Sequence, residues 1–208
     1  MTIAAPTRPT LLYLASRSPR RLQLLRQFNL HVEPLLPADA EDSELLEQSR
    51  PGEAPANYVR RVVRAKLAKA QERATARGLP PAPILAADTT VAIGGTLFGK
   101  PASAAEAAAT LQRLAGRTHR VLTAVAIAHG RRIDSAINVS RVTFARLRRH
   151  DIERYVATGE PMDKAGGYAV QGLAAIFIRR IDGSHSGIMG LPLHETALLL
   201  RRAGFELP

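Results

Sequence analysis

The 208-residue chain contains no cysteine and no tryptophan, and aromatic residues make up only 4% of it. Without cysteine the protein has neither disulfides nor a thiolate nucleophile, which fits a reducing compartment. No run approaches the roughly 18 unbroken apolar residues of a membrane-spanning helix, and residues 1–10 lack the basic start and apolar run of a signal peptide. We therefore expect a cytoplasmic protein with no membrane partner, in which residues 1–10 form a flexible extension.

Acidic residues are the scarcer charge, because 29 Lys and Arg face 18 Asp and Glu, for a net charge of +11. Such an excess is typical of proteins that meet nucleic acid, a membrane surface or a small polyanion. Nucleic-acid binders usually present a continuous basic stripe with aromatic side chains for stacking. Here the arginines are scattered and aromatics are few, so we expect no nucleic-acid partner. Much of the excess belongs on solvated faces, and a phosphate-binding pocket accounts for the rest.

The order of predicted helices and strands is mixed. Helical spacing and capping residues predict helices after Ser18 and within 57–78, 103–116, 148–161 and 190–204. Apolar runs predict strands from residue 11, at 31–36, within 82–101 and 118–147, and late in 163–183. The segment 82–101 is expected to break at Asp88 and to turn at Gly94 and Gly95. This order favours an α/β fold, in which residues 11–208 form a single domain, a mixed twisted sheet flanked by helices, with two lobes around a central cleft.

The stretch "LASRSPRR" places three arginines, Arg17, Arg20 and Arg21, at the start of a predicted helix. The positive end of the helix dipole disfavours cations there but attracts anions. Arg20 and Arg21 can contact phosphate bidentately, and Ser16 and Ser18 can donate hydroxyl hydrogen bonds. Alternatively, the arginines point into water at a cost of a few tenths of a kcal/mol each. The turn contains neither GxxxxGK[ST] nor GxGxxG, which excludes a P-loop and a dinucleotide fingerprint at this place.

Asp88 in "LAADTT" follows an apolar run, and strand ends are where open α/β sheets bind ligands. A carboxylate there can hold a divalent metal or activate a water, although a lone Asp after a strand is often only a turn former. Lys100 in "GKP" and Lys66 in "VRAKLAKA" can meet phosphate or simply be solvated. Gln171, in the glycine-rich "GEPMDKAGGYAVQG", can read a base edge, with a plain turn as the alternative.

The histidines do not fall at paired metal-ligand spacing: His31, His119, His129, His150, His185 and His194. The chain has no GxSxG nucleophile elbow, although a Ser/His/Asp triad assembled from distant residues stays open. Carboxylates, hydroxyls, lysines and arginines are therefore the candidates for chemistry.

Taken in order, "LASRSPRR", "ADTTV", "GKP", "SRVTF", "GEPMDKAGGYAVQG" and "GLPL" resemble the Maf family of nucleoside triphosphate pyrophosphatases. The likeness runs from about Leu11 to the C-terminal helix and implies a Maf/ITPase-like fold. Arg20, Thr89 and Gln171 match the branch that acts on dTTP and UTP, not the branch that acts on 7-methyl-GTP. Arg17 departs from the pattern, since the family often has Gly or Thr there, and its role stays open.

The resemblance implies hydrolysis between the α and β phosphates of dTTP, UTP and modified pyrimidine nucleotides, which cleans the nucleotide pool and has been linked to cell-division arrest. Asp88 would be the proton acceptor, and Asp88 with Glu41 would hold Mg²⁺ or Mn²⁺. Phosphate contacts would come from Ser16, Ser18, Arg21, Lys66 and Lys100, and base selection from Arg20, Thr89 and Gln171. A homodimer is the assembly that the family suggests.

Alternatives are activity on 7-methyl-GTP or on a broad nucleotide range, and a regulatory protein that senses nucleotides or binds nucleic acid. The presence of Asp88 together with Lys100 favours an enzyme, because a binding protein needs no general base.

Overall fold

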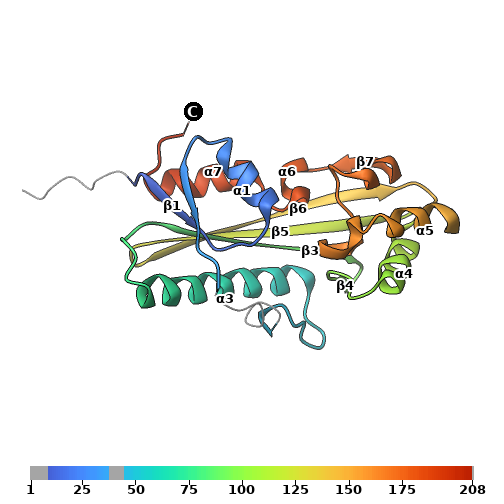
Figure 1. Cartoon of the computed structure of the whole chain (residues 1–208), viewed down its shortest axis with the longest axis horizontal. Helices are drawn as coiled ribbons and strands as arrows, with labels where there is room; N and C mark the ends of the chain where they lie inside the picture. Colours follow the sequence, from blue (N-terminus) through green and yellow to red (C-terminus); the bar gives the residue numbers. More distant parts are fainter. Residues whose placement is uncertain (1–8, 38–44, 208) are drawn as a thin grey trace, which may run out of the picture.

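One mixed sheet carries the fold (Figure 1). The computed structural model describes residues 9–37 and 45–207, so most of the predicted extension at residues 1–10 lies outside the described residues. The strands follow the order β2-β1-β3-β5-β6-β7, with β4 paired to β3. They are β1 (Leu11–Leu14), β2 (His31–Pro34), β3 (Ile84–Ile93), β4 (Thr96–Phe98), β5 (Thr118–His129), β6 (Arg132–Phe144) and β7 (Ile178–Asp182).

Helices cover both faces of the sheet. Figure 1 shows α3 along one face and α1 and α7 on the other. The α-helices are α1 (Pro19–Arg26), α3 (Pro55–Ala76), α4 (Ala104–Leu114), α5 (Arg149–Ala157), α6 (His185–Met189) and α7 (Leu193–Arg202). Three short 3-10 helices, η1 (Glu160–Asp163), η2 (Ala165–Gly167) and η3 (Leu173–Phe177), precede β7. The predicted α/β architecture with a mixed sheet flanked by helices is confirmed.

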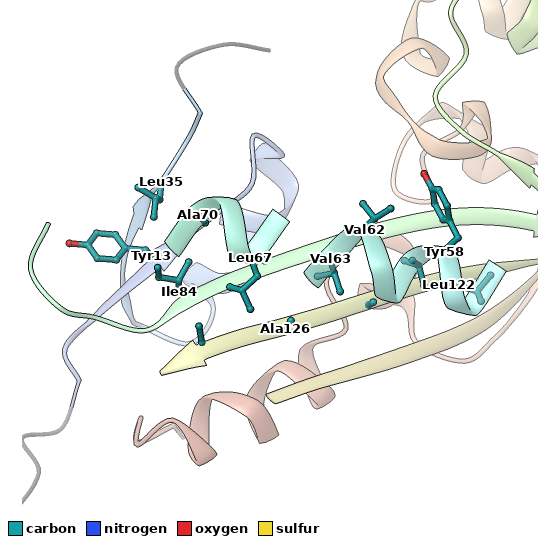
Figure 2. Packing of buried hydrophobic residues seen from close by; sticks show 14 of the residues in the cluster. Tyr13, Leu35, Tyr58, Val62, Val63, Leu67, Ala70, Ile84, Leu122 and Ala126 are labelled. Carbon is teal, nitrogen blue, oxygen red and sulfur yellow. The ribbon is translucent and has the colours of Figure 1, made fainter. Parts of the chain in front are cut away.

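Side chains of β3 alternate between the two covered faces, as the pleat of a strand requires. Ala86 belongs to the cluster under α3, where Val63 and Leu67 pack on the sheet (Figure 2). Leu85 and Ala87 belong to the opposite cluster, with α1 and α7. A third cluster surrounds Phe144 at the far end of β5 and β6 and includes side chains of α4, α5 and η3.

Two local predictions were wrong. The strand expected to break at Asp88 continues as β3, because β5 pairs with it from Ile84 to Ala92 and places Ala124 opposite Asp88. The apolar run 173–177, expected to be strand, is the 3-10 helix η3, and β7 begins only at Ile178. Half of the capping box expected from Ser103 and Glu106 is present, since the Ser103 hydroxyl accepts from the amide of Glu106 at 3.2 Å, whereas the Glu106 carboxylate accepts from the Ala102 amide at 2.8 Å.

Candidate active site

The pocket opens at a gap along one edge of β3. β1 pairs with β3 only at Ile84 and Leu85, and β4 pairs with it only from Val91 to Ile93. Between them, residues 86–90 have no strand partner on this edge among residues 9–37 and 45–207. The gap therefore leaves Asp88 beside a pocket of about 350 Å³, large enough for a small ligand.

Asp88 lies on the α3 side of the gap and is only 5% exposed. Its Oδ1 accepts a hydrogen bond from Lys66 Nζ at 2.7 Å. Burial raises the pKa of the Asp88 carboxyl, and the charges of Lys66 and Arg21 offset only part of that rise. A buried carboxylate with a raised pKa is suited to accept a proton from water near neutral pH.

Glu47 completes this side of the site, and sequence reasoning missed it. Its Oε1 lies 2.6 Å from Lys66 Nζ and its Oε2 lies 3.5 Å from Lys100 Nζ. Burial opposes ionisation of Glu47, but Lys66 and Lys100 outweigh it and lower its pKa. The Glu47 carboxylate is therefore an anion that already occupies the two lysines predicted to bind phosphate.

The chain holds Glu47 in this position through α3. The Tyr58 hydroxyl donates to the Glu47 carbonyl at 2.8 Å, and Arg61 donates to the carbonyls of Leu46 and Gln48 at 3.3 and 2.9 Å. Glu47 lies in an acidic loop, and its spacing from other residues matches no motif. Its negative charge was therefore the only sequence signal that pointed to it. These long-range contacts could not be read from the sequence.

Arg21 enters from the opposite face of the sheet. Its Nε donates to the Gly190 carbonyl at 2.8 Å, its Nη1 to Ser16 Oγ at 3.0 Å and its Nη2 to Thr89 Oγ1 at 3.2 Å. A guanidinium has five N–H donors, so these bonds use three and leave two for a ligand. Burial lowers the pKa of Arg21, while Asp88 and Glu47 oppose that change.

Thr89 holds Arg21 in place through a hydrogen-bonded pair with Thr123. Thr123 Oγ1 donates to the Gly187 carbonyl at 2.7 Å and also lies 3.0 Å from Thr89 Oγ1. Because a hydroxyl carries one proton, Thr89 must donate to Thr123 and accept from Arg21. The proton of the Thr89 hydroxyl is thus directed at Thr123, and its contact on the pocket side is with Arg21.

The helix start carries the serines as predicted, with one difference. Ser18 occupies the N-cap position of α1, but its side chain makes no capping hydrogen bond. Ser16 Oγ accepts from the Ser18 amide at 3.2 Å and from Arg21, which leaves the Ser16 hydroxyl proton for a ligand. Arg17, whose role was open, donates to the Pro37 carbonyl at 3.4 Å.

The pocket also contains Arg20 and Gln171. Arg20 Nη1 lies 3.4 Å from Asp163 Oδ2, and Asp163 also pairs with Lys164. Gln171 lines the pocket just before Gly172 and the start of η3. The structure therefore places two side chains able to read a base edge in the same pocket as the buried carboxylate.

All but one of the predicted site residues line this one pocket: Ser16, Ser18, Arg20, Arg21, Lys66, Asp88, Thr89, Lys100 and Gln171. The exception, Glu41, lies outside the described residues. In the part of the chain that the structure describes, no three His, Cys, Asp or Glu side chains are grouped to hold a metal ion by themselves. Across those same residues, we also find no helix with both the length and the apolar character needed to span a bilayer.

The sequence is similar to known proteins along nearly its whole length. The Maf-like protein family model matches residues 11–203. A dTTP/UTP pyrophosphatase of Polaromonas sp. strain JS666 is 58% identical over 94% of this chain and 96% of its own length. Those of Burkholderia pseudomallei and Cupriavidus metallidurans are 59% and 56% identical, over 96% and 95% of this chain and 96% and 98% of their own lengths.

Among solved structures, the Ham1 protein of Staphylococcus aureus is similar with a TM-score of 0.43 and 14% sequence identity, covering 65% of this chain and 72% of that protein. The family assignment rests on the family model and on the curated relatives, each of which spans nearly the whole chain. The chain belongs to the Maf family.

Proposed function

We propose that the protein hydrolyses nucleoside triphosphates between the α and β phosphates, with dTTP and UTP as preferred substrates. The products are a nucleoside monophosphate and pyrophosphate. One observation carries the proposal: a buried carboxylate, Asp88, lies at a gap in the sheet where Lys66 and Arg21 approach from opposite faces. The names of relatives that share over half of their residues with this chain support the choice of dTTP and UTP.

Asp88 acts as the general base. It accepts a proton from a water whose oxygen attacks the α-phosphorus, while the bond from that phosphorus to the bridging oxygen breaks and pyrophosphate leaves. Negative charge moves toward the leaving group during this step, so cations placed around it lower the barrier. Arg21, Lys66 and Lys100 supply those cations, and the Ser16 hydroxyl adds a donor.

A divalent metal fits this donor set. Mg²⁺ is commonly held by one or two carboxylates together with substrate phosphates, and Asp88 and Glu47 already share one cation, the ammonium of Lys66. We propose that Asp88 holds Mg²⁺ or Mn²⁺ with Glu41, which lies outside the described residues. Such an ion would supply positive charge to the phosphates.

Base selection falls to Arg20 and Gln171, which line the same pocket as Asp88. Thr89 contributes to the site by holding Arg21 in position, because its hydroxyl is bonded to Arg21 and Thr123. The cytoplasmic location and the homodimer stay predictions, and light scattering of the purified protein would test the second.

The test is pyrophosphate release from dTTP, UTP, CTP, GTP and 7-methyl-GTP at equal concentration with Mg²⁺ or Mn²⁺. We expect release fastest from dTTP and UTP, and none with Asp88→Asn. Fastest release from 7-methyl-GTP would overturn the substrate assignment. Nucleotide binding without release from any nucleotide would instead make the protein a nucleotide sensor.

Glu47 predicts a further effect on substrate affinity. A triphosphate that reaches Lys66 and Lys100 meets the Glu47 carboxylate, which is paired with both lysines and repels the phosphates. Neutral Glu47→Gln should compete less, so KM for dTTP should fall about three- to tenfold, or about 0.7–1.4 kcal/mol, with kcat little changed.

Initial-rate kinetics at fixed metal concentration measures this effect. Glu153→Gln is the matched control, because Glu153 forms an exposed pair with Arg149 on α5. A higher KM in Glu47→Gln would show that Glu47 binds the substrate or its metal and does not compete with them.

A further inference from the structure

One carboxylate lies directly behind the segment that carries Gln171. Glu160 Oε2 accepts from the Leu173 amide at 2.9 Å, and Glu160 Oε1 lies 3.4 Å from the Ala174 amide nitrogen. These amides follow Gln171 by two and three residues and open the 3-10 helix η3. An acceptor there satisfies amides that a helix start leaves without partners, so the carboxylate fixes where the chain turns after Gln171.

Gly172 shows how close this contact is. A Cβ built on Gly172 would lie 2.4 Å from Glu160 Oε1 and 2.6 Å from Oε2, well inside any real contact distance. The backbone of Gly172, with φ −104° and ψ −158°, is open to other residues. A side chain at this position would therefore have to push the Glu160 carboxylate aside, although the backbone conformation itself would accept one.

The Glu160 carboxylate is itself held in place by Tyr155 of α5. The buried Tyr155 hydroxyl donates to Oε1 at 2.9 Å, and the Tyr155 ring packs edge-on against Phe177 at 5.3 Å between centroids. Burial, and next the hydrogen bond to Glu160, raise the pKa of the Tyr155 phenol, so it remains a donor. The carboxylate thus joins Tyr155 of α5 to the segment that carries Gln171.

The main chain of Glu160 also connects to Arg20. Its carbonyl accepts from Lys164 Nζ at 2.7 Å, and Lys164 pairs with Asp163, which lies 3.4 Å from Arg20. Both side chains proposed to read the base therefore depend on the position of Glu160, Gln171 through the carboxylate and Arg20 through Lys164 and Asp163.

We propose that Glu160 is a positioning residue that sets the preference among bases by fixing Gln171 in the pocket. This inference rests on the proposed function, since it concerns the choice among nucleotides that the site hydrolyses. The Glu160 carboxylate bonds to Tyr155 and to the amides of Leu173 and Ala174, and not to Asp88, Lys66 or Arg21, so it should alter the ranking of substrates more than the rate of the preferred one.

The experiment compares kcat and KM on dTTP, UTP, CTP and GTP for Gln171→Ala, Glu160→Ala, Glu160→Gln and Gly172→Ala, with Glu153→Gln as a control. Glu160→Ala and Gly172→Ala should each reduce the kcat/KM preference for dTTP over GTP about tenfold, while kcat on dTTP falls less than about threefold. Glu160→Gln should largely retain the ranking, because its amide oxygen can accept from Leu173 while its amide nitrogen donates to the Tyr155 oxygen.

If Glu160→Ala does not fold, as judged by thermal unfolding, Gly172→Ala decides, since it adds one methyl group and displaces the same carboxylate. The inference is overturned if Gln171→Ala relaxes the ranking while Gly172→Ala and any folded Glu160→Ala keep that of the wild type. It is also overturned, with hydrolysis itself still standing, if Gln171→Ala leaves the ranking unchanged. Failure of the wild type to release pyrophosphate is a separate result that would remove the proposed function.

Discussion

Replacing Asp88 by asparagine will reduce pyrophosphate release from dTTP at least a hundredfold while leaving the fold intact. Positioned general bases contribute roughly 10²–10⁴ to rate, and an amide cannot accept the proton of the attacking water. The amide oxygen can still accept from Lys66, which also keeps its bond to Glu47 at 2.6 Å. The loss should therefore appear in kcat, with thermal unfolding still cooperative.

The same substitution should raise stability at neutral pH. Burial raises the folded-state pKa of Asp88 above the value of about 3.9 in an unfolded chain. The folded state therefore binds the proton more tightly, and stability that is present below pH 3.9 is lost as pH rises through the folded pKa. Asparagine carries no such titration, so its stability advantage should grow over that interval and then level off.

Thermal unfolding of the wild type and Asp88→Asn between pH 4 and pH 8 measures this difference, at roughly 2–4 °C for each kcal/mol in a domain of this size. A difference in Tm that is independent of pH would show that Asp88 does not titrate as its burial requires. Wild-type pyrophosphate release by Asp88→Asn would remove Asp88 from the mechanism.

The sequence predicted the local elements well where the signal was itself local. Ser103 and Glu106 correctly predicted the start of α4, and helical spacing around Val62 correctly predicted α3. The break expected at Asp88 failed for a long-range reason. An Asp after an apolar run looks like a strand end, but β5 pairs with β3 from Ile84 to Ala92 and carries the strand through Asp88.

A strand does end beside Asp88, although it is not the strand that carries Asp88, and this end creates the pocket. β1 does end there, because its pairing with β3 stops at Leu85, and the edge beyond it is open as far as Val91. Alternation along β3 then sends Asp88 toward Lys66 and Thr89 toward Arg21. Where each strand ends depends on which strands pair with one another. The residue pattern of a single sequence does not reveal that pairing.

Glu47 marks the other limit of sequence reasoning. The residues that bring it to Lys66 are Tyr58 and Arg61, which bond to the main chain around it from one face of α3. The helical spacing predicted this helix, but not the loop that packs on it. A carboxylate in an acidic loop is ordinarily solvated, and only the fold shows that this one lies between two lysines.

Arg21 and Arg20 should separate into two roles when each is replaced by methionine. Arg21→Met should lower kcat/KM about 10²–10³-fold on every nucleotide, in the range found when a preorganised electrostatic contact is removed. Arg20→Met should change the ranking of nucleotides with a smaller loss on dTTP, because Arg20, which is proposed to select the base, contacts Asp163.

Arg21→Lys and Thr89→Val distinguish charge from geometry. Lysine keeps the cation but cannot bond Gly190, Ser16 and Thr89 at once as the planar guanidinium does. We expect Arg21→Lys to recover only part of the loss, and Thr89→Val, which removes one support without removing charge, to lose less than Arg21→Lys. Each comparison needs thermal unfolding beside it, because Arg21 is half-buried and bonds to three parts of the chain.

A cation at a helix start is opposed by the helix dipole, and Arg21 is held there by three acceptors that come from three separate parts of the chain. The two remaining N–H donors of Arg21 are available to hydrogen-bond an anion, and a triphosphate supplies one. Equal activity of Arg21→Met and the wild type on all nucleotides would mean that these bonds serve the fold alone. A changed ranking in Arg21→Met, with an unchanged one in Arg20→Met, would reverse the two assignments.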